Sequence, residues 1–165
     1  MIAGVREWLR PIITVLAYSG LRFGELRNLR WKDVDLQHGL LHVRVREDWR
    51  PKGRRSRSVP MHRLVRQSIP ARHSGEYVFA GPEGGRLKES YCLKCLTDDR
   101  EELGIQEGTL HTFRHFFISE CAARGVPMAT CMSWVGHRDS EVAWRYYHLS
   151  ETSSREAMKR LEGAQ

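Results

Sequence analysis

The stretch from His111 to His148 constrains the fold of this chain more than any other part of the sequence. It begins HTFRHFF and ends VGHRDSEVAWRYYHL, and Gly125, Pro127 and Gly136 divide it into short segments with helical spacing. Because glycine and proline interrupt helices, we expect several short helices rather than one long helix. These helices must pack so that the histidine, arginine and tyrosine side chains of the stretch meet.

The polar side chains of this stretch have complementary chemistry. Arg114 carries a permanent positive charge, His111 and His137 are imidazoles, and Tyr146 is a phenol. Arginine and histidine stabilise an anion, and a tyrosine oxygen can act as a nucleophile. Such a set suits attack on a phosphodiester. The rest of the chain must then supply more positive charge, a proton donor and a surface for nucleic acid.

The composition agrees with a nucleic-acid partner. The chain has 165 residues, enough for one domain with a core, and a net charge of +7. An arginine-rich basic domain is an ordinary footprint of a nucleic-acid binder, although a basic protein with another role would have the same composition. No apolar run is long enough to cross a membrane, and residues 1–10 lack the pattern of a signal peptide, so we expect a cytoplasmic location.

The four cysteines do not form the pattern of a metal site or a disulfide framework. Cys92 and Cys95 make one C-x-x-C, and a zinc site would need two further ligands at suitable spacing. Cys121 and Cys131 lie in segments with helical spacing. We expect all four to be small apolar core residues and expect no metal or other cofactor. A zinc site completed by histidines is the alternative.

The remaining pattern predicts a mainly α-helical chain with a small antiparallel β-sheet (α+β). Residues 40–45 alternate between apolar and polar side chains, as in a half-buried strand, and a second strand ends at Pro60 after a basic turn. Residues 31–36 are expected to form a turn, and residues 77–79 a short apolar strand. The first helix begins near Pro11. Further helices are expected at residues 21–29, 63–72, 88–103, 112–123, 127–135, 141–148 and 155–161.

Five short motifs occur in order along the chain. They are SGLRFGEL with Arg22, PKGRRSRSVP with Lys52, HTFR with His111 and Arg114, VGH with His137, and the ending YYH, in which Tyr146 lies nine residues beyond His137 and His148 closes the motif. In this order they resemble the catalytic domain of the tyrosine site-specific recombinases of the phage integrase type. One motif alone would be weak evidence, but five in order over almost the whole chain form a specific signal.

The resemblance implies the integrase catalytic-domain fold, with residues 1–165 as a single catalytic domain. It implies that Tyr146 attacks a DNA phosphodiester to give a 3′-phosphotyrosine, which is followed by strand exchange and religation without metal or ATP. Arg22 and Arg114 would bind the non-bridging phosphate oxygens, because arginine offers paired N–H donors and stays charged.

The resemblance also assigns roles to the remaining catalytic positions. His137 would donate a further hydrogen bond to a phosphate oxygen. His111 would accept the tyrosine proton or bond the phosphate. Lys52, on a flexible hairpin, would protonate the leaving 5′ oxygen. Taken singly, each has a plainer reading: Lys52 as part of a solvated charge run, and His111 or His137 as a helix cap.

Other residues are expected to support this site or to bind DNA. Glu25 would orient a basic side chain, and His115 is expected to be a buried histidine that braces Arg114. Tyr147 would pack, since a helix turns by roughly 100° per residue and only one of the two tyrosines can face the phosphate. The basic turn is expected to contact phosphates without reading sequence, through Arg50, Arg54, Arg55 and Arg57.

The expected partners are double-stranded DNA and three further copies of the chain, as a homotetramer on two duplexes and a monomer in solution. Residues 150–165 would form a C-terminal tail helix that docks on a neighbouring protomer or packs within its own. The family's N-terminal domain, which clamps the other face of DNA, is not expected in this chain. Trp144 stands where threonine is common, and Val135 where leucine is usual.

Two other functions fit the same residues. A type IB topoisomerase uses the same nucleophile, although the YYH ending, the GH pair and the small size favour a recombinase. A remnant that binds DNA or a sister protomer without cleaving is kept open by the lack of an N-terminal domain. The DNA target and the host element cannot be inferred from the sequence.

Overall fold

The computed structural model describes residues 4–81, 85–136 and 158, and within them it is rich in helix with one small sheet. Two short 3-10 helices accompany the α-helices and strands. The elements in chain order are η2 (Glu7–Leu9), α1 (Arg10–Ser19), α2 (Phe23–Leu26), η3 (Trp31–Asp33), β1 (Val34–Asp35), β2 (Leu40–Val43), β3 (Arg57–Pro60), α3 (Arg63–Ser68), α4 (Glu89–Glu102), α5 (Thr112–Ala123) and α6 (Met128–Val135).

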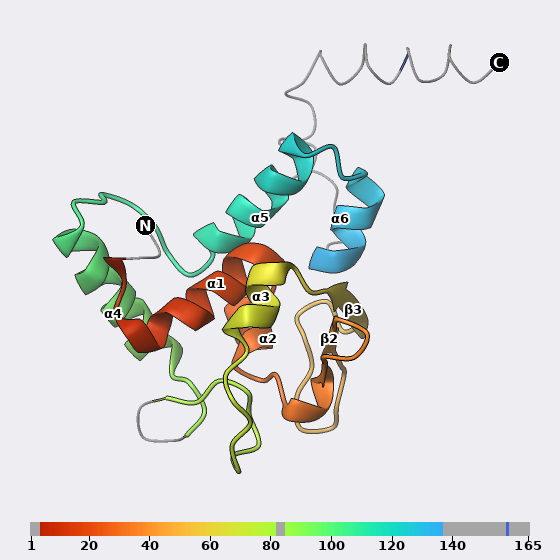
Figure 1. Cartoon of the computed structure of the whole chain (residues 1–165), viewed down its shortest axis with the longest axis horizontal. Helices are drawn as coiled ribbons and strands as arrows, with labels where there is room; N and C mark the ends of the chain where they lie inside the picture. The colour runs from red at the N-terminus through yellow and green to blue at the C-terminus, as the bar shows by residue number, and fades with distance from the viewer. Residues whose placement is uncertain (1–3, 82–84, 137–157, 159–165) are drawn as a thin grey trace.

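Helix α1 is the centre of the described part of the chain. It begins with Pro11 in its first turn, where proline costs no helical hydrogen bond, and its apolar side chains are buried. It packs against α3 and α5, and α4 and the sheet lie toward its two ends (Figure 1). The main core therefore surrounds α1, and Ile118, Cys121, Cys131 and Val135 form a second cluster between α5 and α6.

The sheet is antiparallel with strand order β1-β2-β3. Leu41 pairs with Val34 on one side and with Val59 on the other, and Leu41, Val43 and Val59 are all buried. Alternate residues of β2 thus face the core, as the period of two requires. The sheet fastens both ends of the segment 44–56, which holds the basic turn.

Most predicted elements are confirmed. Helix α5 has the predicted bounds, α6 begins after Pro127 and ends before Gly136, whose φ is +66°, and all four cysteines are buried. Residues 21–29 contain only the four-residue α2, and α3 ends at Ser68. The expected strand at 77–79 is wrong, since Tyr77 makes only an isolated bridge to Arg30, and the expected turn at 31–36 contains β1. The helices predicted at 141–148 and 155–161 lie outside the described residues, apart from Met158.

Gly20 has the tightest surroundings of the left-handed glycines. Its φ is +65°, and an added Cβ would lie 2.4 Å from Phe117 Cδ1 and 2.9 Å from Val135 Cγ1. Gly104 has a φ of +67°, and an added Cβ there would meet nothing within 4 Å. The two positions therefore separate the cost of the backbone conformation from the cost of crowding.

We expect Gly104→Ala to lower the free energy of unfolding by about 1–2 kcal/mol, the cost of a left-handed alanine. Gly20→Ala should lower it by about 1–3 kcal/mol more, because the same conformation is combined with overpacking of the α5–α6 contact. Urea denaturation monitored by circular dichroism measures both values. Equal losses in the two variants would contradict the close packing of Gly20.

Candidate active site

Three of the sequence-predicted catalytic residues meet at one cleft. Arg22 comes from the start of α2, Lys52 from the turn between β2 and β3, and His111 from the start of α5. The cleft has a volume of about 320 Å³ and is open to solvent. Its lining residues come from four separate parts of the chain and are Arg22, Phe23, Gly24, Glu25, Trp49, Arg50, Lys52, Glu89, Leu110 and His111.

Arg22 is placed by the chain reversal after α1. Ser19 and Gly20 end α1, and Arg22 then stands in extended conformation as the residue before α2. Its backbone N–H donates to Glu25 Oε2 at 2.9 Å, and its Nη1 lies 3.5 Å from Glu25 Oε1. A carboxylate three residues into a helix commonly returns to the first N–H in this way. The carboxylate of Glu25 therefore fixes both the backbone and the side chain of Arg22.

Glu25 is buried and is shared with a second arginine. Arg57 Nη1 donates to Glu25 Oε1 at 2.8 Å, and Arg57 Nη2 donates to Oε2 at 2.6 Å. Burial alone would raise the pKa of Glu25, but the hydrogen bonds and charge of Arg57 and the Arg22 N–H outweigh burial and hold it below the ordinary value. Glu25 is therefore a carboxylate at neutral pH and holds two basic side chains.

Arg114 does not line the cleft and is only 1% exposed. Its Nη1 donates to the carbonyl of Gly20 at 2.6 Å, and its Nη2 donates to the carbonyl of Val135 at 2.6 Å. Burial and then the charge of Arg22 lower the pKa of Arg114 to about 9, which leaves the guanidinium charged at neutral pH. Arg114 thus joins the end of α1 to the end of α6 while staying close to Arg22.

Lys52 lies in a tight turn at the edge of the cleft. The N–H of Arg54 donates to the carbonyl of Pro51 at 2.8 Å, so that Lys52 and Gly53 are the two central residues of the turn. An added Cβ on Gly53 would lie 3.3 Å from the carbonyl oxygen of Gly136. The turn therefore rests against the residue that precedes His137 in the sequence.

The four arginines expected to contact phosphate fall into two groups. Arg50, Arg54 and Arg55 are exposed, as Lys52 is. Arg57 departs from that expectation, since its guanidinium is 11% exposed and is held by Glu25 and by the carbonyl of Trp134. Phosphate contact by the other three stays a prediction.

His111 and His115 form an edge-on ring pair at the start of α5. Their ring centroids are 4.9 Å apart with planes at 88°. His115 is half-buried rather than buried as expected. Burial lowers the pKa of His111, and the positive neighbours His115, Arg114, Arg22 and Lys52 lower it further. His111 therefore favours its neutral form.

The remaining predicted residues cannot be placed in this site. His137, Tyr146, Tyr147, His148 and the tail 150–165 lie outside the described residues, except Met158. Over residues 4–81 and 85–136, no group of three His, Cys, Asp or Glu side chains is arranged to hold a metal ion. In the same part of the chain no helix is long and apolar enough to cross a membrane.

The sequence analysis missed several contributors to the site. Backbone carbonyls of Gly20, Trp134 and Val135 hold the buried arginines, and no residue type indicates such a contact. Trp49 and Glu89 also line the cleft. Glu89 is the first residue of α4. Because it lies far from Lys52 in the sequence, only the fold shows that both residues line one cleft.

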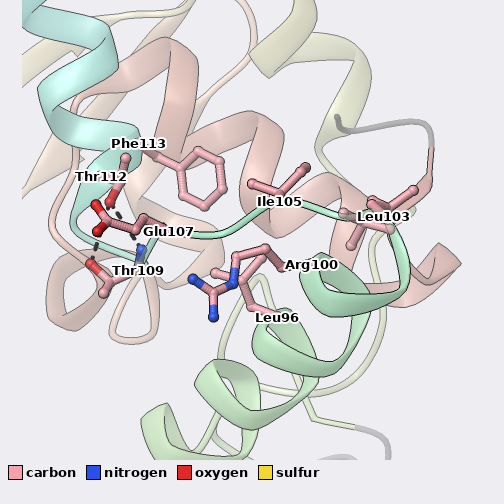
Figure 2. A pocket seen from close by; sticks show the side chains of 10 residues that line it. Leu96, Arg100, Leu103, Ile105, Glu107, Thr109, Thr112 and Phe113 are labelled. Atoms are coloured by element: carbon pink, nitrogen blue, oxygen red, sulfur yellow. Dashed lines mark hydrogen bonds between the residues drawn. The ribbon is translucent and has the colours of Figure 1, made fainter.

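A second pocket lies between α4 and the start of α5 and has a different character (Figure 2). Its volume is about 40 Å³, room for little more than one water molecule. Apolar side chains dominate its wall, including Leu96, Leu103, Ile105 and Phe113. Because it lacks the convergent cations of the cleft, we do not assign it to the candidate active site.

Comparison with known proteins agrees with this geometry. The profile of the phage integrase family matches residues 4–153. The tyrosine recombinase XerC of Staphylococcus haemolyticus is 29% identical over 162 residues, which cover 92% of this chain and 52% of XerC. The chain thus spans about half the length of the curated relatives it matches.

Solved structures share the fold. The crystal structure of XerA recombinase is 26% identical with a TM-score of 0.71, over 93% of this chain and 56% of that one. The Tn1549 transposon integrase in complex with transposon right end DNA has a TM-score of 0.77 at 22% identity, over 94% of this chain and 59% of that one. The family profile covers residues 4–153, and the cleft brings Arg22, Lys52 and His111 together. The chain therefore belongs to the phage integrase family, as a tyrosine recombinase catalytic domain.

Proposed function

We propose that this chain is the catalytic part of a site-specific DNA strand transferase that integrates or recombines DNA. The observation that carries the proposal is the charge at the cleft. The guanidinium groups of Arg22, Arg57 and Arg114 lie around the buried carboxylate of Glu25, and Lys52 lies at the edge of the cleft. Such an excess of fixed positive charge in a partly dry site stabilises an anion. A DNA phosphate is the anion that the family relationship points to.

Arg22 and Arg114 are the proposed phosphate clamps. Among the described residues, Arg22 Nη1 and Arg114 Nε are buried N–H groups without a hydrogen-bond partner, the kind of group that a bound phosphate would satisfy. Their other contacts hold them in place before DNA arrives. Donors that are held in advance need not reorganise as negative charge builds on the non-bridging oxygens.

The proposed reaction is a transesterification. The phenol oxygen of Tyr146 forms a bond to phosphorus while the bond from phosphorus to the 5′ oxygen breaks. His111 accepts the phenol proton, and Lys52 gives a proton to the leaving 5′ oxygen. His137 would donate to a phosphate oxygen. Because the 3′-phosphotyrosine keeps the ester bond, religation by the reverse reaction needs neither metal nor ATP.

The neutral form of His111 suits the role of proton acceptor. Its positive surroundings and burial disfavour the imidazolium, so the lone pair stays available near neutral pH. A histidine that bound phosphate by its positive charge would instead benefit from a raised pKa. The lowered pKa therefore supports the role of base among the two roles open for His111.

The proposed substrate is double-stranded DNA, bound by four copies of the chain on two duplexes. Exposed Arg50, Arg54 and Arg55 beside the cleft support backbone contacts that do not read sequence. The tail 150–165 is proposed to dock on a neighbouring protomer, with packing in its own protomer as the other arrangement. We place the protein in the cytoplasm, where the DNA of a bacterium, archaeon or phage is found.

The nucleophile is tested with a suicide DNA substrate that carries a nick beside the cleavage site. The unmodified chain should give a covalent protein–DNA adduct on a denaturing gel. Tyr146→Phe should abolish the adduct, because the attacking oxygen is lost, and Tyr147→Phe should retain it. The reverse pattern would move the nucleophile to Tyr147. Relaxation of plasmid DNA without recombinant products would favour the topoisomerase alternative, and DNA binding without an adduct the non-catalytic one.

The state of His111 is tested by NMR titration of the imidazole in the DNA-free protein. We expect its midpoint below the ordinary histidine value of about 6.5, because the charged form is disfavoured in the folded state. His115→Ala should raise the midpoint, since it removes a like-charged neighbour and part of the burial. His42→Ala, at a half-buried position of β2, is the matched control and should leave the midpoint of His111 unchanged. A midpoint at or above about 6.5 would contradict the assigned base.

A further inference from the structure

Each of the three nitrogens of the Arg57 guanidinium donates a hydrogen bond to the protein itself. Its two terminal nitrogens donate to the two oxygens of Glu25 at 2.8 and 2.6 Å, and its Nε donates to the carbonyl of Trp134 at 2.6 Å. Lysine cannot reproduce this paired geometry, because it carries one nitrogen instead of a planar fork. Arg57 thus joins the first residue of β3 to α2 and to the end of α6.

Each contact of Arg57 leads to a different part of the proposed active site. Glu25 holds the backbone and side chain of Arg22. Trp134 is next to Val135, whose carbonyl holds Arg114. Lys52 lies five residues before Arg57 on the same β2–β3 connection. The three cationic groups assigned to phosphate chemistry are therefore tied together through one side chain.

The end of α6 is shaped to admit this side chain. Gly136 ends the helix with φ of +66°, and an added Cβ there would lie 3.0–3.1 Å from the guanidinium of Arg57. The free carbonyls at a helix C-terminus favour a cation. Gly136 is also the residue before His137, so Arg57 contacts the chain immediately before this proposed catalytic residue.

We propose that Arg57 is a positioning residue, which acts through Glu25 and the end of α6 to set Arg22 and Arg114 relative to the Lys52 turn, and that it is not a phosphate contact. The inference rests on the proposed function for its catalytic consequence. Its structural part, the dependence of Glu25 on Arg57, holds for the DNA-free protein.

The test separates cleavage from binding. Adduct formation on the suicide substrate is measured at saturating protein, and binding to plain duplex is measured by fluorescence anisotropy at several salt concentrations. Arg57→Ala should slow adduct formation about 100-fold, the scale expected when catalytic groups shift by an ångström. Its slope of log affinity against log salt should equal that of the unchanged chain. Arg55→Ala, an exposed arginine on the same connection, should reduce that slope by about 0.9.

A double variant tests whether Arg57 acts through Glu25. Glu25→Gln alone should slow adduct formation, and Arg57→Ala with Glu25→Gln should be no slower than the slower single variant, since residues that act as one unit are not additive. Losses that multiply would overturn the proposal. A reduced salt slope in Arg57→Ala together with an unchanged cleavage rate would overturn it as well and would make Arg57 a phosphate contact.

A DNA-free measurement keeps the two proposals distinguishable. Carbon-13 NMR titration of the Glu25 carboxyl should give a pKa below its ordinary value in the unchanged chain and a higher one in Arg57→Lys, which keeps the charge but loses the fork. If Arg57→Ala does not fold, Arg57→Lys takes its place in the cleavage and binding assays. The proposal then requires slower adduct formation and an unchanged salt slope in Arg57→Lys. If the unchanged chain forms no adduct, the proposed function fails, and the Glu25 titration and the salt slopes still decide the role of Arg57.

Discussion

The burial of the Arg114 charge is the constraint on which the rest of the site depends. A guanidinium that is 1% exposed has lost nearly all of its water, and a buried charge without compensation is costly. Here the compensation comes from two carbonyls at the C-terminal ends of helices, those of Gly20 after α1 and Val135 in α6. The C-terminal ends of α1 and α6 must therefore both lie beside the guanidinium of Arg114. These two helices end where the buried arginine needs hydrogen-bond acceptors.

Glu25 is one buried carboxylate beside three guanidinium groups, so the described part of the site keeps a net positive charge. Burial lowers the pKa of His111, and the positive charge of Arg114 and Arg22 lowers it further. A second buried carboxylate would stabilise the DNA-free fold but would also compete with a phosphate for the same N–H donors. The stability of the free protein and the affinity for an anion are therefore opposed at this cleft. Low stability at a functional site is a common form of this trade-off.

The sequence predicted several helices better than it predicted the contacts between their side chains. Helix α5 was recovered to the residue because its capping region and apolar spacing are local signals. The failed strand at 77–79 shows the limit of such signals, since an apolar triplet forms a strand only when a partner strand runs beside it. Arg57 was grouped with its neighbours in a basic run, although the alternation of β3 turns it inward. Only the pairing of β3 with β2 reveals which arginine of the run faces the core.

The connection between β2 and β3 combines a fixed end with an exposed lysine, the proposed general acid. Arg57 anchors its C-terminal end through three hydrogen bonds, and pairing of Val43 with Arg57 closes the strands beside it. Lys52 lies on the exposed turn that this anchored base carries, next to Gly53 and the carbonyl of Gly136. A proton donor must approach a leaving oxygen whose position is set by DNA, so some freedom at the lysine is useful. This freedom does not displace the whole turn, because Arg57 at its base is bound to Glu25, the same carboxylate that orients Arg22. Rigidity at Arg57 and exposure at Lys52 are thus two parts of one arrangement.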